Sequence, residues 1–174
     1  MITVTQLIAV MPYARAKAPL FIGFINETLA EFDISTPARV CAYLAQVGHE
    51  SGQLRYVEEL ASGDAYEGRH DLGNTQPGDG RRFRGHGLIQ VTGRTNHQAA
   101  ADYFGKSLDE IVGWLTTPEG ATRSSGWFWM THGLNKYADS GDFTGLTRRI
   151  NGGINGLADR QALYDRAINA LRVS

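Results

Sequence analysis

Two glutamates, Glu50 and Glu59, are the residues of this sequence whose type and spacing best suit chemistry, and a Ser-Gly pair lies between them. Two carboxyl groups can hydrolyse a glycosidic bond when one protonates the leaving oxygen and the other activates water or attacks the sugar. A protein can keep one carboxyl protonated by burying it and the other ionised by leaving it hydrated. Because glutamate pairs are also common on solvated surfaces, the pair alone does not establish a catalytic site.

Residues 37–50 are predicted to form the helix that positions Glu50. Ser35-Thr36-Pro37 is a typical helix start, with a capping side chain and proline in the first turn. Val40, Tyr43, Leu44 and Val47 form an apolar stripe, and Glu50 falls on the same face. Its carboxyl should therefore be partly desolvated, with the raised pKa that a general acid needs. Gly52 should end the helix, which puts the acid at an edge of the core.

The remaining segments predict a mainly α protein. Residues 3–11 and 16–32 have helical patterns, and we expect the helices of residues 1–34 to pack on the catalytic domain. Residues 62–80 are polar, glycine-rich and irregular, with room for a short hairpin. Residues 83–92 alternate as a short strand would, and Gly85 and Gly87 permit tight turns or a close approach to a ligand. A small β-hairpin or irregular segment is therefore expected around residues 55–95.

Length and charge limit the classes of function. The 174 residues fit one domain with two lobes, and a net charge of −1 provides no overall field for binding nucleic acid or a membrane surface. Arginines are nevertheless concentrated in residues 81–94 and 143–174, which would suit an anionic polymer.

The lone cysteine and the apolar pattern bear on where the protein is made. Cys41 has no partner for an internal disulfide, and it lies in an apolar helical run typical of the core. We find no signal peptide and no apolar run long enough to span a membrane. We therefore expect synthesis in a bacterial host cytoplasm, no stable membrane insertion, and action on the cell wall after release, for example by holin-type export.

Four stretches together resemble family 19 glycoside hydrolases, the chitinases and related phage endolysins. They are HESG (49–52), FRGHGLIQVTGRTNH (83–97), SSGWFWMTHGLN (124–135) and INGGINGLADR (150–160). The similarity runs from about Thr36 onward, and the order and spacing are closest to the shorter phage and bacterial branch. It implies a two-lobed, lysozyme-like fold around a cleft and an inverting mechanism.

The resemblance also implies roles for individual residues. Glu50 matches the general acid, Glu59 the general base, and Thr92 the residue that helps hold the attacking water. Residues that line the sugar cleft or support the carboxylates are matched by Gln90, Asn96, Asn151 and Arg160.

Two positions depart from the family pattern. His86 stands where arginine is frequent between the two glycines, and LASGDA (60–65) lacks the Asn-Tyr-Ser sequence usual after the base. The second departure leaves the local register open, so Glu58 remains an alternative to Glu59 as the base.

The sequence therefore predicts an endolysin that hydrolyses β-1,4 bonds of peptidoglycan glycan strands, acts without cofactor or metal, and is monomeric. Chitinase activity on N-acetylglucosamine polymers is the alternative within the same chemistry. A zinc amidase would need converging ligands, but the five histidines follow no helical ligand spacing and no HExxH occurs. A wall-binding module without catalysis is disfavoured because both glutamates and Thr92 are present.

Overall fold

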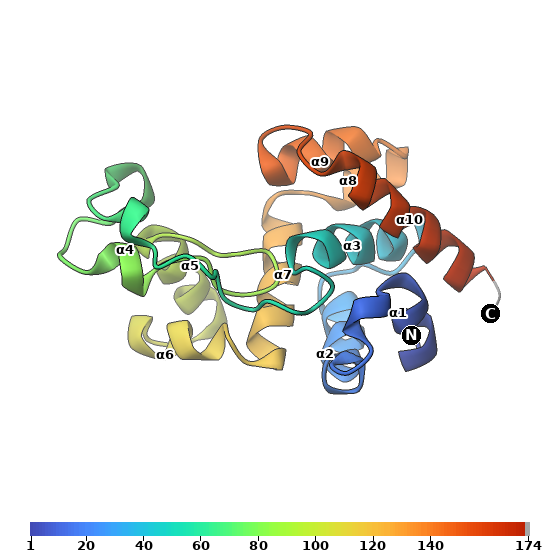
Figure 1. The fold of residues 1–174 in the computed structure, drawn as a ribbon, viewed down its shortest axis with the longest axis horizontal. Helices are drawn as coiled ribbons and strands as arrows, with labels where there is room; N and C mark the ends of the chain where they lie inside the picture. Colours follow the sequence, from blue (N-terminus) through green and yellow to red (C-terminus); the bar gives the residue numbers. More distant parts are fainter. Residues whose placement is uncertain (173–174) are drawn as a thin grey trace. The chain divides into compact units, whose positions relative to one another are not determined.

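The computed structural model describes residues 1–172 and is built mainly from helices, which confirms the predicted fold class (Figure 1). The helices are α1 (Val4–Val10), α2 (Ala18–Glu31), α3 (Pro37–Glu50), α4 (Asp79–Arg82), α5 (Arg94–Phe104), α6 (Leu108–Trp114), α7 (Pro118–Thr131), α8 (Asn135–Ser140), α9 (Phe143–Asn151) and α10 (Leu157–Leu171), with 3-10 turns at Pro12–Ala14, Asp64–Tyr66 and His70–Leu72. Within residues 1–172, no helix has both the length and the apolar character needed to cross a bilayer.

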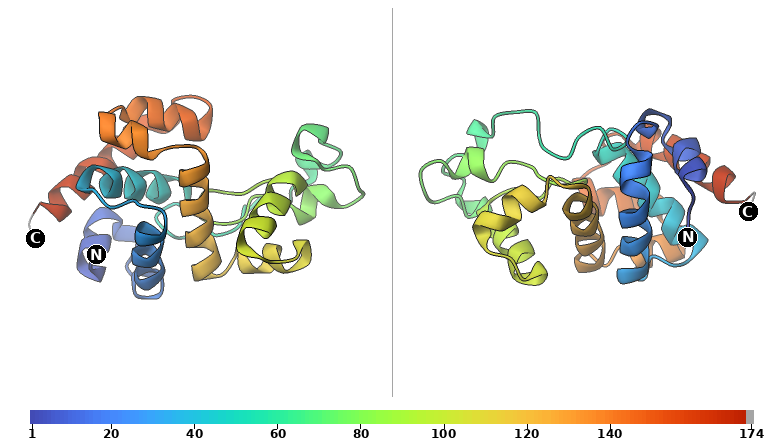
Figure 2. Two further views of the ribbon diagram at one scale, coloured as in Figure 1. Left: turned by 180° about the vertical axis from the view of Figure 1, so that it is seen from behind. Right: turned by 90° about the horizontal axis from the view of Figure 1, so that it is seen from below.

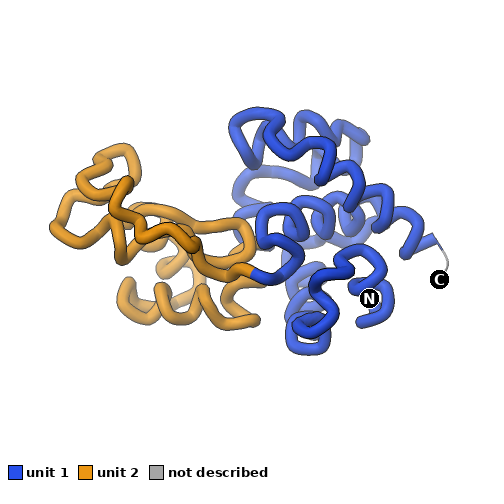
Figure 3. Tube along the Cα trace, viewed as in Figure 1, with its two compact units in different colours: residues 1–55, 126–174 blue, residues 56–125 orange. Residues whose placement is uncertain are grey.

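The chain divides into two compact units, coloured separately in Figure 3. Unit 1 comprises Met1–Arg55 and the described residues from Gly126 onward, so it is built from two separate stretches of sequence. Unit 2 is the continuous stretch Tyr56–Ser125. The helices of residues 1–34 belong to unit 1, and α7 contributes residues to both units.

Helix α3 lies at the centre of unit 1, with α8 and α9 on one side of it and α1 and α2 on the other (Figures 1 and 2). The long helix α10 packs along α3 and also contacts α1. As the sequence predicts, Thr36 caps α3 by accepting a hydrogen bond from the Arg39 amide, and Pro37 occupies the first turn. Most of the predicted stripe is buried, since Tyr43, Leu44 and Val47 have no exposed surface, whereas Val40 is half-buried.

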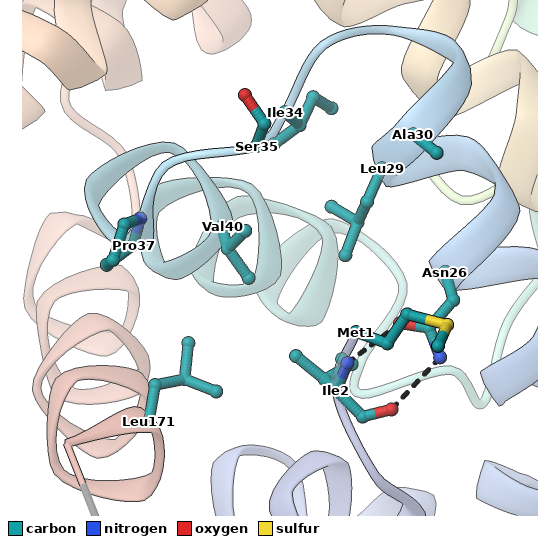
Figure 4. A pocket seen from close by; sticks show the side chains of 10 residues that line it. All are labelled: Met1, Ile2, Asn26, Leu29, Ala30, Ile34, Ser35, Pro37, Val40 and Leu171. Atoms are coloured by element: carbon teal, nitrogen blue, oxygen red, sulfur yellow. Dashed lines mark hydrogen bonds between the residues drawn. The ribbon is translucent and has the colours of Figure 1, made fainter. Parts of the chain in front are cut away.

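A hollow of about 370 Å³ lies where Met1 and Ile2, at the start of the chain, meet α2, α3 and α10 (Figure 4). Its walls are mostly apolar and include Ile2, Leu29, Val40 and Leu171. Asn26 fixes the chain start by accepting a hydrogen bond from the Ile2 amide at 2.8 Å and donating one to the Ile2 carbonyl at 2.9 Å. None of the site residues predicted from the sequence lines this hollow.

Residues 62–80 of unit 2 form an ordered series of turns, so the short hairpin considered for this segment does not occur. The Glu67 carboxylate accepts hydrogen bonds from the amides of Gly78 and Gly80, at 2.7 and 2.8 Å. Asp79 is buried and pairs with Arg94 at 2.5 Å, which joins the segment to the start of α5. This hydrogen bond with Arg94 is the main cause of the lowered pKa of Asp79.

The predicted strand over residues 83–92 is wrong in form. His86 makes isolated antiparallel bridges to Glu58 and to Val91. Residues 87–90 form the turn between His86 and Val91. Gly87 and Gln90 both have positive φ, 87° and 52°, which an extended strand does not accommodate. The alternating pattern thus belongs to a tight turn whose apolar side chains are buried.

A matched pair of glycine substitutions, one in α7 and one in α6, tests how closely these two helices are packed. At Gly126 in α7, an added Cβ would lie 2.2 Å from Phe32 and 2.5 Å from Thr28, whereas at Gly113 in α6 nothing lies within 4 Å. We expect Gly126→Ala to lower the free energy of unfolding by about 1–3 kcal/mol through overpacking. Gly113→Ala should raise it by about 0.5 kcal/mol, because alanine is the better helix former. Urea denaturation measures both, and equal effects of the two changes would contradict the packing described.

Candidate functional site

The predicted acid, Glu50, ends α3 in unit 1, and its side chain keeps 22% of its surface exposed. Its Oε1 atom is buried and lies 2.6 Å from Nη2 of Arg160, an ion pair without hydrogen-bond geometry. Arg160 comes from the first turns of α10 and its side chain is 2% exposed. The structure therefore brings together two residues that the sequence places 110 positions apart.

Arg160 is held by further polar groups of unit 1. Its Nη1 donates to Oε1 of Gln46 at 2.5 Å, and its Nε donates to the carbonyl of Asn155 at 3.2 Å. Gln46 in turn donates to the hydroxyl of Thr147 at 2.9 Å. A buried guanidinium is costly unless its donors are satisfied. The network connects α3, α9 and α10 and fixes the cation beside Glu50.

His49, the neighbour of Glu50, pairs with the same end of α10. Its Nδ1 lies 2.6 Å from Oδ2 of Asp159. Gly156 immediately precedes α10 with φ of 72°, and a Cβ there would lie 2.3 Å from Cε1 of His49. The glycine-rich loop after α9 therefore approaches the imidazole ring more closely than any other residue type would allow.

Asn151 is the last residue of α9 and is exposed. Within residues 1–172 its side chain makes no hydrogen bond to Glu50 or Arg160. The structure thus joins Arg160 to the predicted acid directly, but does not join Asn151 to it.

The predicted base, Glu59, lies in unit 2 and is held by Gly85 and Tyr66. The Gly85 amide donates to Oε2 of Glu59 at 3.0 Å, and the Glu59 amide donates to the Gly85 carbonyl at 2.8 Å. The Tyr66 hydroxyl donates to Oε1 of Glu59 at 3.0 Å. Burial raises the pKa of Tyr66, and this hydrogen bond to Glu59 raises it further. Both oxygens of Glu59 thus accept a hydrogen bond from a neutral donor.

Gln90, Thr92 and Asn96 gather next to Gly85. A Cβ at Gly85 would lie 2.3 Å from Oε1 of Gln90, so the glycine allows this side chain to approach the backbone that binds Glu59. The Thr92 hydroxyl donates to the Gln90 carbonyl at 2.9 Å, and the Asn96 side chain donates to the Thr92 carbonyl at 2.8 Å. Three of the predicted residues are therefore linked in one short hydrogen-bonded series within unit 2.

Glu58 has different surroundings from Glu59. Its Oε1 contacts the guanidinium of Arg84 and lies 3.3 Å from Nε2 of His86. Its side chain is 41% exposed, and its interactions are those of a surface ion pair. The choice of Glu59 over Glu58 as base stays a prediction, but the two carboxylates differ clearly in their hydrogen-bond donors.

His86 and His97 form a buried pair beneath this turn. Nδ1 of His86 lies 2.9 Å from Nε2 of His97, and Nδ1 of His97 lies 2.8 Å from the carbonyl of Gly93. Both rings are buried, with exposures of 1% and 0%. Burial lowers the pKa of His86 against the opposing effect of Glu58, and burial lowers the pKa of His97 to about 4.

Several supporting residues were not predicted from the sequence. Gln46 lies one helical turn before Glu50, and this spacing was the available signal. No local pattern indicates the contact of Tyr66 with Glu59 or that of Asp159 with His49, since both depend on the tertiary fold. In the described part of the chain, no three His, Cys, Asp or Glu side chains are grouped so as to hold a metal ion.

The chain is similar to several known proteins. It is 30% identical over 155 residues to a glycosyl hydrolase family 19 domain-containing protein of Haemophilus influenzae, an alignment that covers 70% of this chain and 74% of that protein. The chain belongs to glycosyl hydrolase family 19. It is a glycoside hydrolase, as that family is defined, although no protein-family model matches the sequence.

The chain is also similar to two chitinases. An endochitinase of Arabidopsis thaliana is 36% identical over 115 residues, covering 66% of this chain and 39% of the endochitinase. The chain therefore spans well under half of that plant protein. The crystal structure of chitinase C from Streptomyces griseus HUT6037 has the same fold, with a TM-score of 0.76 at 21% identity over 98% of this chain and 92% of that one. The helical fold of this family 19 chain is thus shared with a chitinase.

Burial of His97, the partner of His86, makes the free energy of unfolding depend on pH. His97 has a pKa of about 4 in the folded protein against 6.5 when unfolded, so between these values the unfolded chain binds a proton that the folded chain does not. Stability should therefore fall as pH drops from about 6.5 to about 4, by on the order of 3 kcal/mol from this group. Urea denaturation at stepped pH measures the slope. His97→Phe should make it shallower, and an unchanged slope would contradict the assignment.

Proposed function

We propose that this family 19 enzyme is an endolysin that hydrolyses β-1,4 glycosidic bonds of bacterial peptidoglycan with inversion at the anomeric carbon. The observation that carries the chemistry is the different environment of the two carboxyl groups. Glu50 has one buried oxygen against Arg160, whereas Glu59 accepts hydrogen bonds from the Gly85 amide and the Tyr66 hydroxyl. Acid and base roles require unlike environments, and the assignment of the acid role to Glu50 comes from its match to the acid of the family.

In the proposed mechanism, Glu50 is the general acid that protonates the leaving oxygen. Arg160, which donates a hydrogen bond to Gln46, lies against the buried oxygen of Glu50, and this leaves Oε2 to act on the substrate. Glu59 is the general base and removes a proton from the attacking water. Its fixed orientation at Gly85 restricts the positions from which water can be deprotonated.

Other residues would position water and sugar. We propose that the Thr92 hydroxyl orients the attacking water, and that Gln90 and Asn96 contact sugar hydroxyl and acetamido groups. Asn151 would extend these contacts from the end of α9, where it is exposed. The mechanism uses side chains and water and needs no metal or cofactor.

Charge favours peptidoglycan over chitin as the substrate. The α9 surface next to Asn151 carries two exposed arginines, Arg148 and Arg149. Peptidoglycan carries carboxylates on the peptides that are attached to the lactyl groups of its sugars, whereas chitin is uncharged. Only peptidoglycan would therefore be attracted to this basic surface. The protein would act as a monomer on the cell wall after release from the cytoplasm in which it is made.

Chitinase activity is the second candidate, because the sequence relatives and structural neighbours include chitinases. Both polymers contain β-1,4-linked N-acetylglucosamine, and the proposed acid and base chemistry is the same for each. The two activities are therefore separated by substrate and not by mechanism.

Glutamine substitutions at three glutamates test the catalytic roles. Glu50→Gln keeps the side-chain shape but removes the titrating proton, so the rate of wall hydrolysis should fall by about 10²–10⁴-fold. Glu59→Gln should be similarly impaired, whereas Glu58→Gln, which lacks only an exposed ion pair, should retain most activity. The measurement is turbidity loss of purified cell walls, with unfolding curves as the control for folding. Near-normal activity of folded Glu50→Gln would refute the acid role, and reversed effects at positions 58 and 59 would move the base to Glu58.

Product analysis tests the bond and the stereochemistry. Direct attack by water inverts the anomeric carbon, so a β-linked substrate should release the α-anomer first. We expect mass spectrometry of digested peptidoglycan to show new reducing ends on glycan strands with peptides intact, and NMR of fresh product to show the α-anomer. Hydrolysis of chitin oligomers with no effect on walls would favour the chitinase alternative. Release of the β-anomer first would exclude the base role of Glu59. Cleavage of the peptides that stops when a chelator is added would indicate a zinc amidase.

A further inference from the structure

We propose that His86 and His97 are positioning residues for Glu59, and that they act through the one hydrogen bond between their rings. The inference rests on the proposed role of Glu59 as base, and it concerns how the backbone of Gly85 is kept in place to bind that carboxylate.

The segment Gly85–Gly87 is bonded along both edges. On one edge, the Gly85 amide and carbonyl bind Glu59, and the Gly87 amide donates to the Val57 carbonyl at 2.8 Å. On the other edge, the His86 amide donates to the Val91 carbonyl at 3.0 Å, and the His86 carbonyl accepts a hydrogen bond from the Val91 amide at 2.7 Å. The His86 side chain is the only side chain of this segment, since glycines flank it. Its ring is therefore the segment's sole side-chain attachment to the core of unit 2.

The hydrogen-bond donors of the pair follow from Gly93. A carbonyl oxygen accepts and does not donate, so Nδ1 of His97 must carry the hydrogen that it shares with Gly93. With a pKa of about 4, His97 is neutral near pH 7, and its Nε2 is an acceptor. Nδ1 of His86 must then donate. One tautomer of each ring satisfies the whole series from Gly93 to His86.

Two interactions of the His86 ring differ in strength. The bond to His97 is 2.9 Å long and buried on both sides. The contact of Nε2 with Glu58 is 3.3 Å long, and Glu58 is 41% exposed and also pairs with Arg84. Buried hydrogen bonds are costly to leave unmade. In the tautomer that the Gly93 carbonyl requires, Nε2 of His86 carries no hydrogen and donates nothing to Glu58. The bond to His97 therefore determines the orientation of the ring.

Two amide substitutions at His86 separate these interactions. In His86→Asn, the amide nitrogen falls near the place of Nδ1 and can donate to His97, but it is too short to reach Glu58. In His86→Gln, the amide falls near the place of Nε2 and reaches Glu58, but not His97. The pair is matched in chemistry, so a difference between the two variants reports on the His97 bond.

Exchange of the Gly85 amide hydrogen gives a readout that does not depend on activity. Relative to the wild type, we expect His86→Gln to reduce the protection of this amide by about tenfold or more beyond any loss of global stability, because a buried bond is lost. His86→Asn should keep protection within about threefold of the wild type by the same measure. Equal loss in both variants, or none in His86→Gln, would overturn the proposal.

Activity on peptide-free peptidoglycan glycan strands provides the second readout. The rate at saturating strand concentration should fall about tenfold in His86→Gln with little change in KM, since a misplaced base affects the transition state. His86→Asn should recover most of that rate. A fall confined to KM, or no recovery by asparagine, would contradict positioning.

The pH profile adds a third comparison, at pH values above the pKa of His97. Near pH 7 the charged or titratable groups facing His86 are Glu58, Glu59, Arg84 and His97. The pKa of His86 is lowered from 6.5 by burial and that of His97 is about 4, so both rings are neutral from pH 7 upward. The ratio of wild-type to His86→Gln rates should therefore be constant from about pH 7 to 9. A ratio that follows a titration in this range would indicate a charge effect and refute the neutral hydrogen bond.

His97→Phe breaks the same bond from the other ring and carries the test if His86→Gln does not fold. It should reduce Gly85 protection as His86→Gln does, whereas unchanged protection would overturn the proposal. If the wild type failed to cleave glycan strands, the proposed function would be wrong, but the exchange measurements would still decide whether the histidine pair fixes Gly85.

Discussion

The buried positive charge of Arg160 is the constraint on which unit 1 depends. The Arg160 side chain is only 2% exposed. A guanidinium removed from water in this way is stable only when its hydrogen-bond donors and its charge are satisfied. Gln46 from α3 and Asn155 before α10 accept its hydrogen bonds, and Glu50 provides the opposite charge. The central helix and the last helix of the unit are thereby fixed at the one point where the predicted acid lies.

In unit 2, the carboxylate of Glu59 is held in part by a backbone group. Glu59 is bound by the amide of a glycine and by a tyrosine hydroxyl, and within residues 1–172 no cation pairs with it. A backbone donor is only as well placed as the segment that carries it, so its position depends on how the turn around residues 85–92 is packed. The two glutamates therefore differ in kind: one is held by a buried side-chain charge, the other by main-chain geometry.

The sequence predicts the fold class and the central helix well, because their signals are local. Thr36 and Pro37 mark the start of α3, and an apolar stripe places Glu50 on its inner face. The family resemblance predicts for Arg160 only a general role in lining the cleft or supporting the carboxylates. Its pairing with Glu50 is seen in the structure, since no periodicity relates residues so far apart in the chain.

Predictions failed where several structures share one local pattern. The alternation at residues 88–92 fits a strand as well as a turn with buried apolar side chains, and only the positive φ values of Gly87 and Gln90 distinguish the two. The contact of Tyr66 with Glu59 and the pairing of His86 with His97 have no local signal, because both arise when separate segments of unit 2 meet.

The discontinuity of unit 1 has a consequence for synthesis on the ribosome. Unit 2 is a continuous stretch, so all of its residues are synthesised before the second part of unit 1. Glu50 emerges early but gains its counter-ion only when Arg160 has left the exit tunnel. Domains tend to fold as units as the chain grows. The acid would thus stay hydrated and unpaired until Arg160 has been made, and a translation product interrupted before that residue would lack a completed acid site.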